Sequence, residues 1–193
     1  MSATSAPTVS AWNVPNALTV LRIVLVPVFV VVLLTDDGAS TSMRIWAALI
    51  FAVAVATDWL DGDLARRQGL VTDFGKIADP IADKALIGAA LICLSILGEL
   101  AWWITVVIMV REIGVTVLRF IVIRRGVIPA SRGGKLKTTL QSLGLLLLIL
   151  PLSGFLSAVG LIVIYVALLV TVVTGVDYVL QAWRVWRGAG VSS

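Results

Sequence analysis

The sequence of 193 residues has no histidine, one cysteine and few charged side chains. Only 13% of its residues are Asp, Glu, Lys or Arg, about half the fraction usual in soluble domains. Without histidine, a general base must be a carboxylate or another side chain, and a metal site must be built from oxygen ligands. Cys93 lies alone in an apolar run, so a disulfide within the sequence is excluded and a packing role is expected.

Long apolar runs make up most of the sequence, which is 60% hydrophobic with a mean hydropathy of +1.07. Each run approaches or exceeds the roughly 20 residues that cross a bilayer core, and helices satisfy every backbone amide there. We therefore predict an all-α integral membrane protein with six transmembrane helices. It forms one domain, 1–193, in which 1–15 is a surface or disordered segment. The expected spans are about Asn16–Leu34, Arg44–Arg66, Ile77–Leu97, Trp102–Ile123, Lys135–Leu152 and Phe155–Trp183.

The basic residues predict the orientation. They gather between spans two and three, between spans four and five, and in the C-terminal tail, whereas the other connections carry at most one. The positive-inside rule then places both termini at the cytoplasmic face of the cell membrane. The first span is not expected to be a cleaved signal, because no basic residue precedes it. The net charge of +4 is attributed to anionic lipid heads, so no nucleic-acid partner is expected.

An acid-rich stretch, 57–84, holds six of the eleven acidic residues. Asp58 and Asp61 are spaced i, i+3, and Asp79 and Asp83 are spaced i, i+4, so each pair lies on one helix face. Two helices joined by a short turn would bring the four carboxylates together. Two such charges at 4 Å repel by about 4 kcal/mol at an effective dielectric near 20. Divalent cations or protons would relieve this repulsion; solvated acids at helix ends are the simpler alternative.

Two divalent ions in an all-oxygen site favour phosphate chemistry, because they hold a diphosphate and orient an attacking oxygen. Asp83 is placed to accept the proton of an incoming hydroxyl. Two alternative functions belong to other classes of membrane protein. One is a divalent-cation transporter, since acids inside a membrane also mark ion paths. The other is a structural membrane protein whose charges only anchor helix ends, although this gives no reason for the spacing.

The motif Asp58-x2-Asp61-Gly62-x2-Ala65-Arg66-x8-Gly75-x3-Asp79-x3-Asp83 resembles the signature of the CDP-alcohol phosphatidyltransferases. The resemblance implies six transmembrane helices and a homodimer. It also implies two divalent ions, Mg²⁺ or Mn²⁺, held by the first three aspartates, with the fourth as base and near a metal. In such enzymes an alcohol attacks the β-phosphorus of a CDP-linked lipid and CMP leaves. The residues that the resemblance places at the CDP-lipid are Asn16, Thr19, Gly62, Arg66, Thr72 and Gly75.

Two further stretches bear on which alcohol is the acceptor: "REIGVTVLR" and "SRGGKLKTTLQ". Arg111, Lys135 and Lys137 could form an anion pocket, which suits an acceptor that carries its own phosphate. Two simpler interpretations stay open. Arg111 could merely pair with an acid such as Glu112 or Asp177, and the lysines could be ordinary cytoplasmic anchors.

Three stretches, "PNALTVLR", "REIGVTVLR" and "GGKLKTTLQ", resemble the branch of the family that joins glycerol 3-phosphate to CDP-diacylglycerol. This branch forms phosphatidylglycerophosphate in phospholipid biosynthesis. The nearest alternative inside the family is a cardiolipin synthase, which uses phosphatidylglycerol as acceptor. The expected partners are therefore CDP-diacylglycerol, glycerol 3-phosphate, membrane lipids and a second copy of the chain, with the active site facing the cytoplasm.

Overall fold

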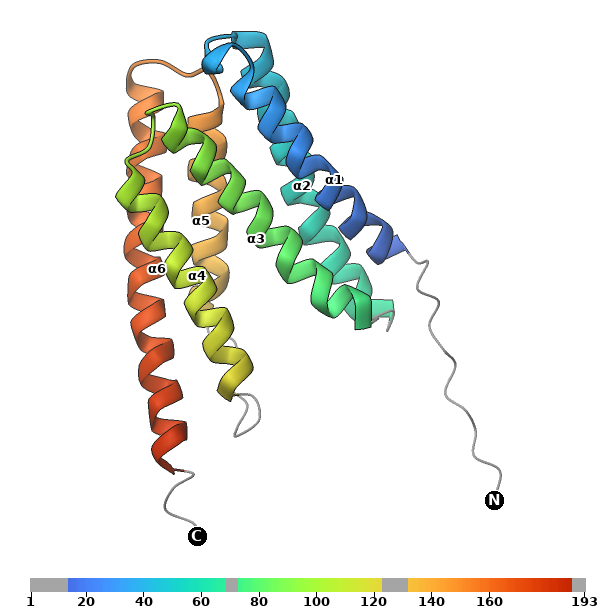
Figure 1. The fold of residues 1–193 in the computed structure, drawn as a ribbon, viewed down its shortest axis with the longest axis vertical. Helices are drawn as coiled ribbons and strands as arrows, with labels where there is room; N and C mark the ends of the chain where they lie inside the picture. The colour runs from blue at the N-terminus through green and yellow to red at the C-terminus, as the bar shows by residue number, and fades with distance from the viewer. Residues whose placement is uncertain (1–13, 69–72, 123–131, 189–193) are drawn as a thin grey trace, which may run out of the picture. The chain divides into compact units, whose positions relative to one another are not determined.

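The computed structural model describes residues 14–68, 73–122 and 132–188. For 14–15, 58–68, 73–80, 120, 122, 132–134, 185 and 188, only the helical backbone is described. Within these ranges the chain forms six α-helices and one short 3-10 helix and contains no strand (Figure 1). The elements are α1 (Val14–Leu34), η1 (Thr35–Gly38), α2 (Thr41–Gln68), α3 (Asp73–Ile96), α4 (Trp102–Val122), α5 (Arg132–Ile149) and α6 (Phe155–Gly188).

Each expected span corresponds to one helix, so the all-helical prediction is confirmed. The largest shifts are at the start of α3, which begins at Asp73 rather than Ile77, and at the end of α6, which continues to Gly188 rather than Trp183. Pro80 therefore lies about two turns inside α3.

The turns follow from residues that tolerate left-handed backbone. Asp36 and Asp37 in η1 have φ of 53° and 51°, a region that aspartate enters more readily than most residues. The C-terminus of α3 is closed by Gly98, with φ of 74°. The amide of Gly98 donates to the carbonyl of Ser95 at 3.2 Å, and that of Glu99 donates to Leu94 at 3.0 Å. These bonds satisfy carbonyls that the helix end leaves without partners.

The chain divides into two compact units, 1–89 and 90–193. In the first, α1 packs against α2 around a core of aromatic and small residues. Phe29 and Phe51 are buried with their ring centroids 5.7 Å apart, and Ala47 and Ala54 are completely buried. Aromatic contacts and small residues let the two helices approach closely.

The second unit contains the end of α3 together with α4, α5 and α6. Helices α5 and α6 approach closely at Gly144, which has no Cβ. A Cβ added there would lie 2.8 Å from the side chain of Ile164. Leu145, Ile149 and Ala167 complete the buried seam between these helices. Because no larger side chain fits at position 144, this glycine sets the distance between α5 and α6.

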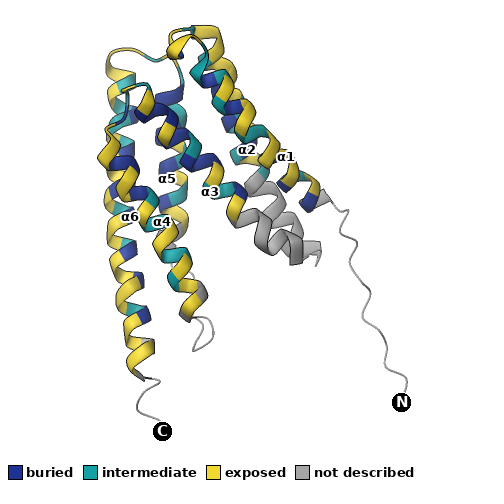
Figure 2. Cartoon of the chain, in the orientation of Figure 1, coloured by how far each residue is buried: buried dark blue, intermediate teal, exposed yellow. Residues whose placement is uncertain are grey.

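Exposed residues run along the helices (Figure 2). Many of them are large and apolar, as lipid-facing residues are. Phe155 at the start of α6 is 81% exposed, and exposed valines and leucines continue along that helix. Two stretches of the described chain, Asn16–Gly38 and Phe155–Arg184, are long and apolar enough to cross a bilayer. The chain thus has two clearly membrane-capable helices, and membrane crossing by α2–α5 stays a prediction.

Candidate active site

The four motif aspartates lie on two helices. Asp58 and Asp61 are in α2, and Asp79 and Asp83 are in α3, so the helical spacing assumed for both pairs is present in the backbone. The side chain of Asp83 is half-buried. Only the helical backbone is described for the other three aspartates and for Gly62, Arg66 and Gly75, and Thr72 lies outside the described residues.

The connection between α2 and α3 limits how far the two pairs can separate. Only residues 69–72 join Gln68 to Asp73, and five Cα steps span at most about 18 Å. With a rise of 1.5 Å per residue, Asp61 lies about 10 Å along α2 from this connection and Asp79 about 9 Å along α3. Asp58 and Asp83 are both about 15 Å from it. The sequence thus sets the aspartates at matching heights on the two helices.

The donor set fits a divalent cation of the magnesium type. All four candidate ligands are carboxylates, and hard cations such as Mg²⁺ and Mn²⁺ prefer oxygen. Among the side chains that the structure describes, no group of three or more possible metal ligands is found. Because only Asp83 of the four is among those side chains, this finding does not bear on the predicted cluster.

The start of α1 presents a buried polar face. Asn16 is 5% exposed, Thr19 is 1% exposed and Arg22 is completely buried, at i, i+3 and i+6. Measured back from the η1 turn, Asn16 lies about 27 Å along α1, and Asp58 lies about 26 Å along α2. Since α1 packs against α2, the predicted CDP-lipid residues of α1 and the first aspartate pair occupy the same end of the unit.

Arg22 is a residue whose role the sequence analysis missed. It belongs to the "PNALTVLR" stretch and shares the face of Asn16 and Thr19. A fully buried arginine in an otherwise apolar helix is a functional candidate. The signal was present in the sequence, because the i, i+3, i+6 spacing already set Arg22 beside the two residues that were assigned.

A buried ionic cluster lies in the second unit, where α4, α5 and α6 meet. Glu112 of α4 accepts from Arg111 Nη1 at 3.1 Å and pairs through the same oxygen with Lys137 Nζ of α5. Lys137 is only 5% exposed, whereas Lys135 is exposed. Of the three predicted acceptor residues, the structure therefore brings together Arg111 and Lys137 but not Lys135.

Arg111 is also bound to α6. Its Nε donates to the Thr171 carbonyl at 3.1 Å, and its Nη2 donates to Thr174 Oγ1 at 2.8 Å. Gln141 of α5 donates to Thr171 Oγ1 at 3.3 Å and extends the network. The pairing of Arg111 with Glu112 that the simpler interpretation expected is present. Two cationic side chains, Arg111 and Lys137, therefore converge on the same carboxylate oxygen.

Gly175 gives Arg111 the space to lie along α6. A Cβ at this position would be 3.0 Å from Arg111 Cγ and 3.3 Å from Nε. Thr171, Thr174 and Gly175 form one helix face at i, i+3 and i+4. The sequence analysis missed all three, although the spacing of polar and small residues in "TVVTG" was the signal that could have revealed them.

Comparisons with known proteins assign the chain to a family. The sequence model of the family described as CDP-alcohol phosphatidyltransferase matches residues 12–173. A probable phosphatidylglycerophosphate synthase of Mycobacterium tuberculosis (strain H37Rv) is 56% identical over 172 residues, covering 89% of this chain and 82% of that protein.

Two more distant relatives carry the name CDP-diacylglycerol–glycerol-3-phosphate 3-phosphatidyltransferase. The protein from Bacillus subtilis is 37% identical over 186 residues, which is 90% of this chain and 96% of that protein. The protein from Rickettsia typhi is 38% identical over 171 residues, which is 86% of this chain and 94% of that protein. The chain therefore belongs to the CDP-alcohol phosphatidyltransferase family.

Proposed function

We propose that the chain transfers the phosphatidyl group of CDP-diacylglycerol to a hydroxyl of glycerol 3-phosphate, forming phosphatidylglycerophosphate and releasing CMP. The names of its relatives support this reaction. The observation that carries it is the convergence of Arg111 and Lys137 on a single carboxylate inside a largely apolar helical unit. Such a cluster suits an acceptor that brings its own phosphate.

The whole chain, 1–193, would act as one membrane domain. We propose six transmembrane helices with both termini and the active site at the cytoplasmic face of the cell membrane, and a homodimeric assembly. The two membrane-capable helices and the outward-facing apolar side chains support membrane residence. The basic residues between the predicted spans support the orientation.

Four aspartates would hold two divalent ions, Mg²⁺ or Mn²⁺: Asp58, Asp61, Asp79 and Asp83. When bound, the ions neutralise the diphosphate and stabilise the leaving group. Asp83 accepts the proton of the glycerol 3-phosphate hydroxyl as its oxygen forms a bond to the β-phosphorus. The bond between that phosphorus and the bridging oxygen breaks, and CMP leaves with the electron pair. The residues proposed to bind the CDP-lipid are Asn16, Thr19, Gly62, Arg66, Thr72 and Gly75.

The acceptor phosphate would bind at Arg111, Lys135 and Lys137. Two cationic side chains, Arg111 and Lys137, meet at Glu112. Nη1 and Nη2 of Arg111 each carry two N–H groups, and one on each is used by Glu112 or Thr174. One donor on each nitrogen therefore remains for a phosphate oxygen. Lys135 is exposed and would add long-range attraction for the acceptor.

An acceptor screen tests this function. Purified protein would receive CDP-diacylglycerol, Mg²⁺ or Mn²⁺ and one alcohol at a time, with released CMP as the readout. We expect CMP only with glycerol 3-phosphate, and none once a chelator removes the divalent ions. Turnover with phosphatidylglycerol instead would identify a cardiolipin synthase. Full activity in chelator would overturn the metal site, and no CMP with any alcohol would overturn the transferase proposal.

Replacing Gly175 tests whether the position of Arg111 against α6 affects binding of the acceptor. In Gly175→Val the new side chain would push Arg111 away from Thr171 and Thr174. We expect the KM for glycerol 3-phosphate to rise about tenfold, because the acceptor loses roughly one charge-assisted hydrogen bond. The KM for CDP-diacylglycerol should stay nearly unchanged. Gly114→Ala is the control, because a Cβ at Gly114 meets nothing within 4 Å. Equal changes in both KM values would contradict an acceptor role for Arg111.

A further inference from the structure

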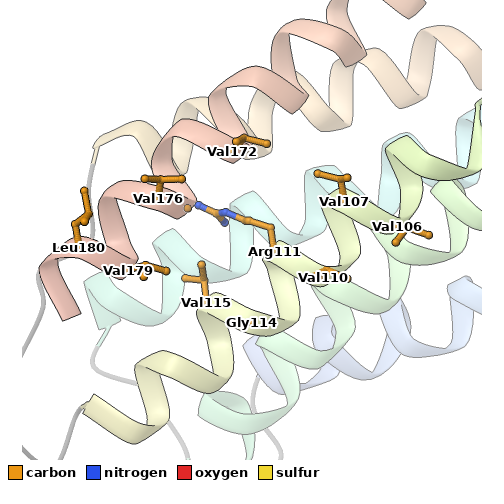
Figure 3. Close-up of a pocket in the computed structure, with 11 residues that line it drawn as sticks. Val106, Val107, Val110, Arg111, Gly114, Val115, Val172, Val176, Val179 and Leu180 are labelled. Atoms are coloured by element: carbon orange, nitrogen blue, oxygen red, sulfur yellow. The ribbon is translucent and has the colours of Figure 1, made fainter. Parts of the chain in front are cut away.

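An open groove runs between α4 and α6 within the second unit, with a volume of about 600 Å³ (Figure 3). Its walls are almost entirely aliphatic, and Arg111 is the one charged residue in the lining. Both walls are accessible from outside, since Val110 is 66% exposed and Val179 is 52% exposed. The lining valines are Val106, Val107, Val110 and Val115 of α4 with Val172, Val176 and Val179 of α6.

The groove is open beside Gly114. Gly114 lines it, and a Cβ built there meets no other atom within 4 Å. The α4 wall from Val106 to Val115 spans about 14 Å at 1.5 Å per residue. This length is close to half of the roughly 30 Å hydrocarbon core of a bilayer. The groove therefore matches the depth of one leaflet, which is the reach of a single acyl chain.

Two arginines follow the groove at the C-terminal ends of both helices. Arg119 lies one turn beyond Val115 on α4, and its guanidinium carbon is 5.8 Å from the ring centroid of Tyr178 on α6. On α6, Trp183 lies one turn beyond Val179, and the guanidinium carbon of Arg187 is 3.7 Å from the Trp183 ring. Both arginines are exposed. Their aromatic contacts hold two positive charges at the end of the apolar groove.

From this arrangement we propose that the α4–α6 groove binds one anionic phospholipid of the surrounding bilayer. One acyl chain lies along the valines, and the phosphate lies at Arg119 and Arg187. Charge complementarity selects this occupant over a zwitterionic lipid, because a net negative head group balances the arginines. Two basic residues near a membrane surface favour an anionic head by about 30-fold in total. This site is additional to the proposed CDP-lipid site, whose residues belong to α1, α2, α3 and the 69–72 connection.

Photo-crosslinking tests the proposal in the full-length protein. The probe is phosphatidylglycerol with a diazirine on one acyl chain, incorporated into phosphatidylcholine nanodiscs. We expect lipid adducts on peptides that contain 106–115 and 172–180, at least tenfold above those from a matching phosphatidylcholine probe. Gly114→Leu fills the groove and should lower the adduct yield at least fivefold. Val117→Leu is the control, because Val117 is an exposed α4 residue outside the lining.

Three outcomes would overturn the proposal. Equal labelling by the two probes would mean that ordinary bulk lipid fills the groove. Displacement by excess unlabelled CDP-diacylglycerol would assign the groove to the chains of that lipid. Absence of lipid adducts on these peptides, together with cross-links between two copies of the chain, would assign the groove to a dimer interface. The double variant Arg119→Gln/Arg187→Gln should reduce phosphatidylglycerol labelling to the phosphatidylcholine level, and unchanged labelling would also contradict the proposal.

Discussion

Asp83→Asn is expected to lower kcat by about 10³-fold while binding of CDP-diacylglycerol changes little. General-base catalysis typically contributes 10² to 10⁴ in rate, and an amide cannot accept the proton of the attacking hydroxyl. Asparagine keeps the size and the half-buried position of the side chain on α3. The readouts are CMP release at saturating substrates and, separately, equilibrium binding of the CDP-lipid. Purified Asp83→Asn that releases CMP at the parent rate would exclude Asp83 as the base.

The matched control for this variant is Asp177→Asn. Asp177 is an exposed carboxylate on α6 that accepts a hydrogen bond from Gln181 at 2.7 Å. It shares the charge and the helical setting of Asp83 but belongs to neither proposed pocket. We expect its rate and its binding of CDP-diacylglycerol to match the parent. A comparable loss in both variants would point to a general effect of removing a carboxylate.

The elements of the fold were predictable because hydropathy alone separates the apolar runs. The aspartate pairs were also predictable, since their spacing fixes a helix face wherever the backbone is helical. The start of α3 was harder to place, because hydropathy recognises the apolar body of a helix and not its polar first turn. Asp73–Lys76 is that polar turn, and it lay outside the predicted apolar span Ile77–Leu97.

The role of α6 could not be predicted from apolar content. Thr174 donates to the Val170 carbonyl at 2.7 Å, so within its own helix the hydroxyl is satisfied and gives no sign of a partner. Its second function, accepting from Arg111, becomes visible only when α4 and α6 are packed. Cys93 shows the opposite case, because it is buried as its apolar surroundings predicted.

Replacing Lys137 tests whether the ionic cluster binds the acceptor or only holds the helices together. Lys137→Met removes a buried positive charge but keeps an unbranched apolar side chain of similar length. We expect the KM for glycerol 3-phosphate to rise about 100-fold, because truncating one partner of a buried charge pair costs roughly 2–5 kcal/mol. The KM for CDP-diacylglycerol should change less than threefold. Steady-state kinetics with each substrate varied in turn would measure both values.

Glu112→Gln separates the structural contribution of this pair from its binding contribution. Alone, it removes the carboxylate that Lys137 and Arg111 both contact, and breaking a buried ion pair from one side costs about 3–5 kcal/mol of stability. In Glu112→Gln/Lys137→Met neither charge of that pair remains, so the unfolding temperature should recover towards the parent value. The acceptor KM should stay raised about 100-fold, because the lysine that binds the phosphate is still missing. If stability and acceptor KM recovered together in the double variant, Lys137 would be a structural partner of Glu112 and not a ligand for the acceptor.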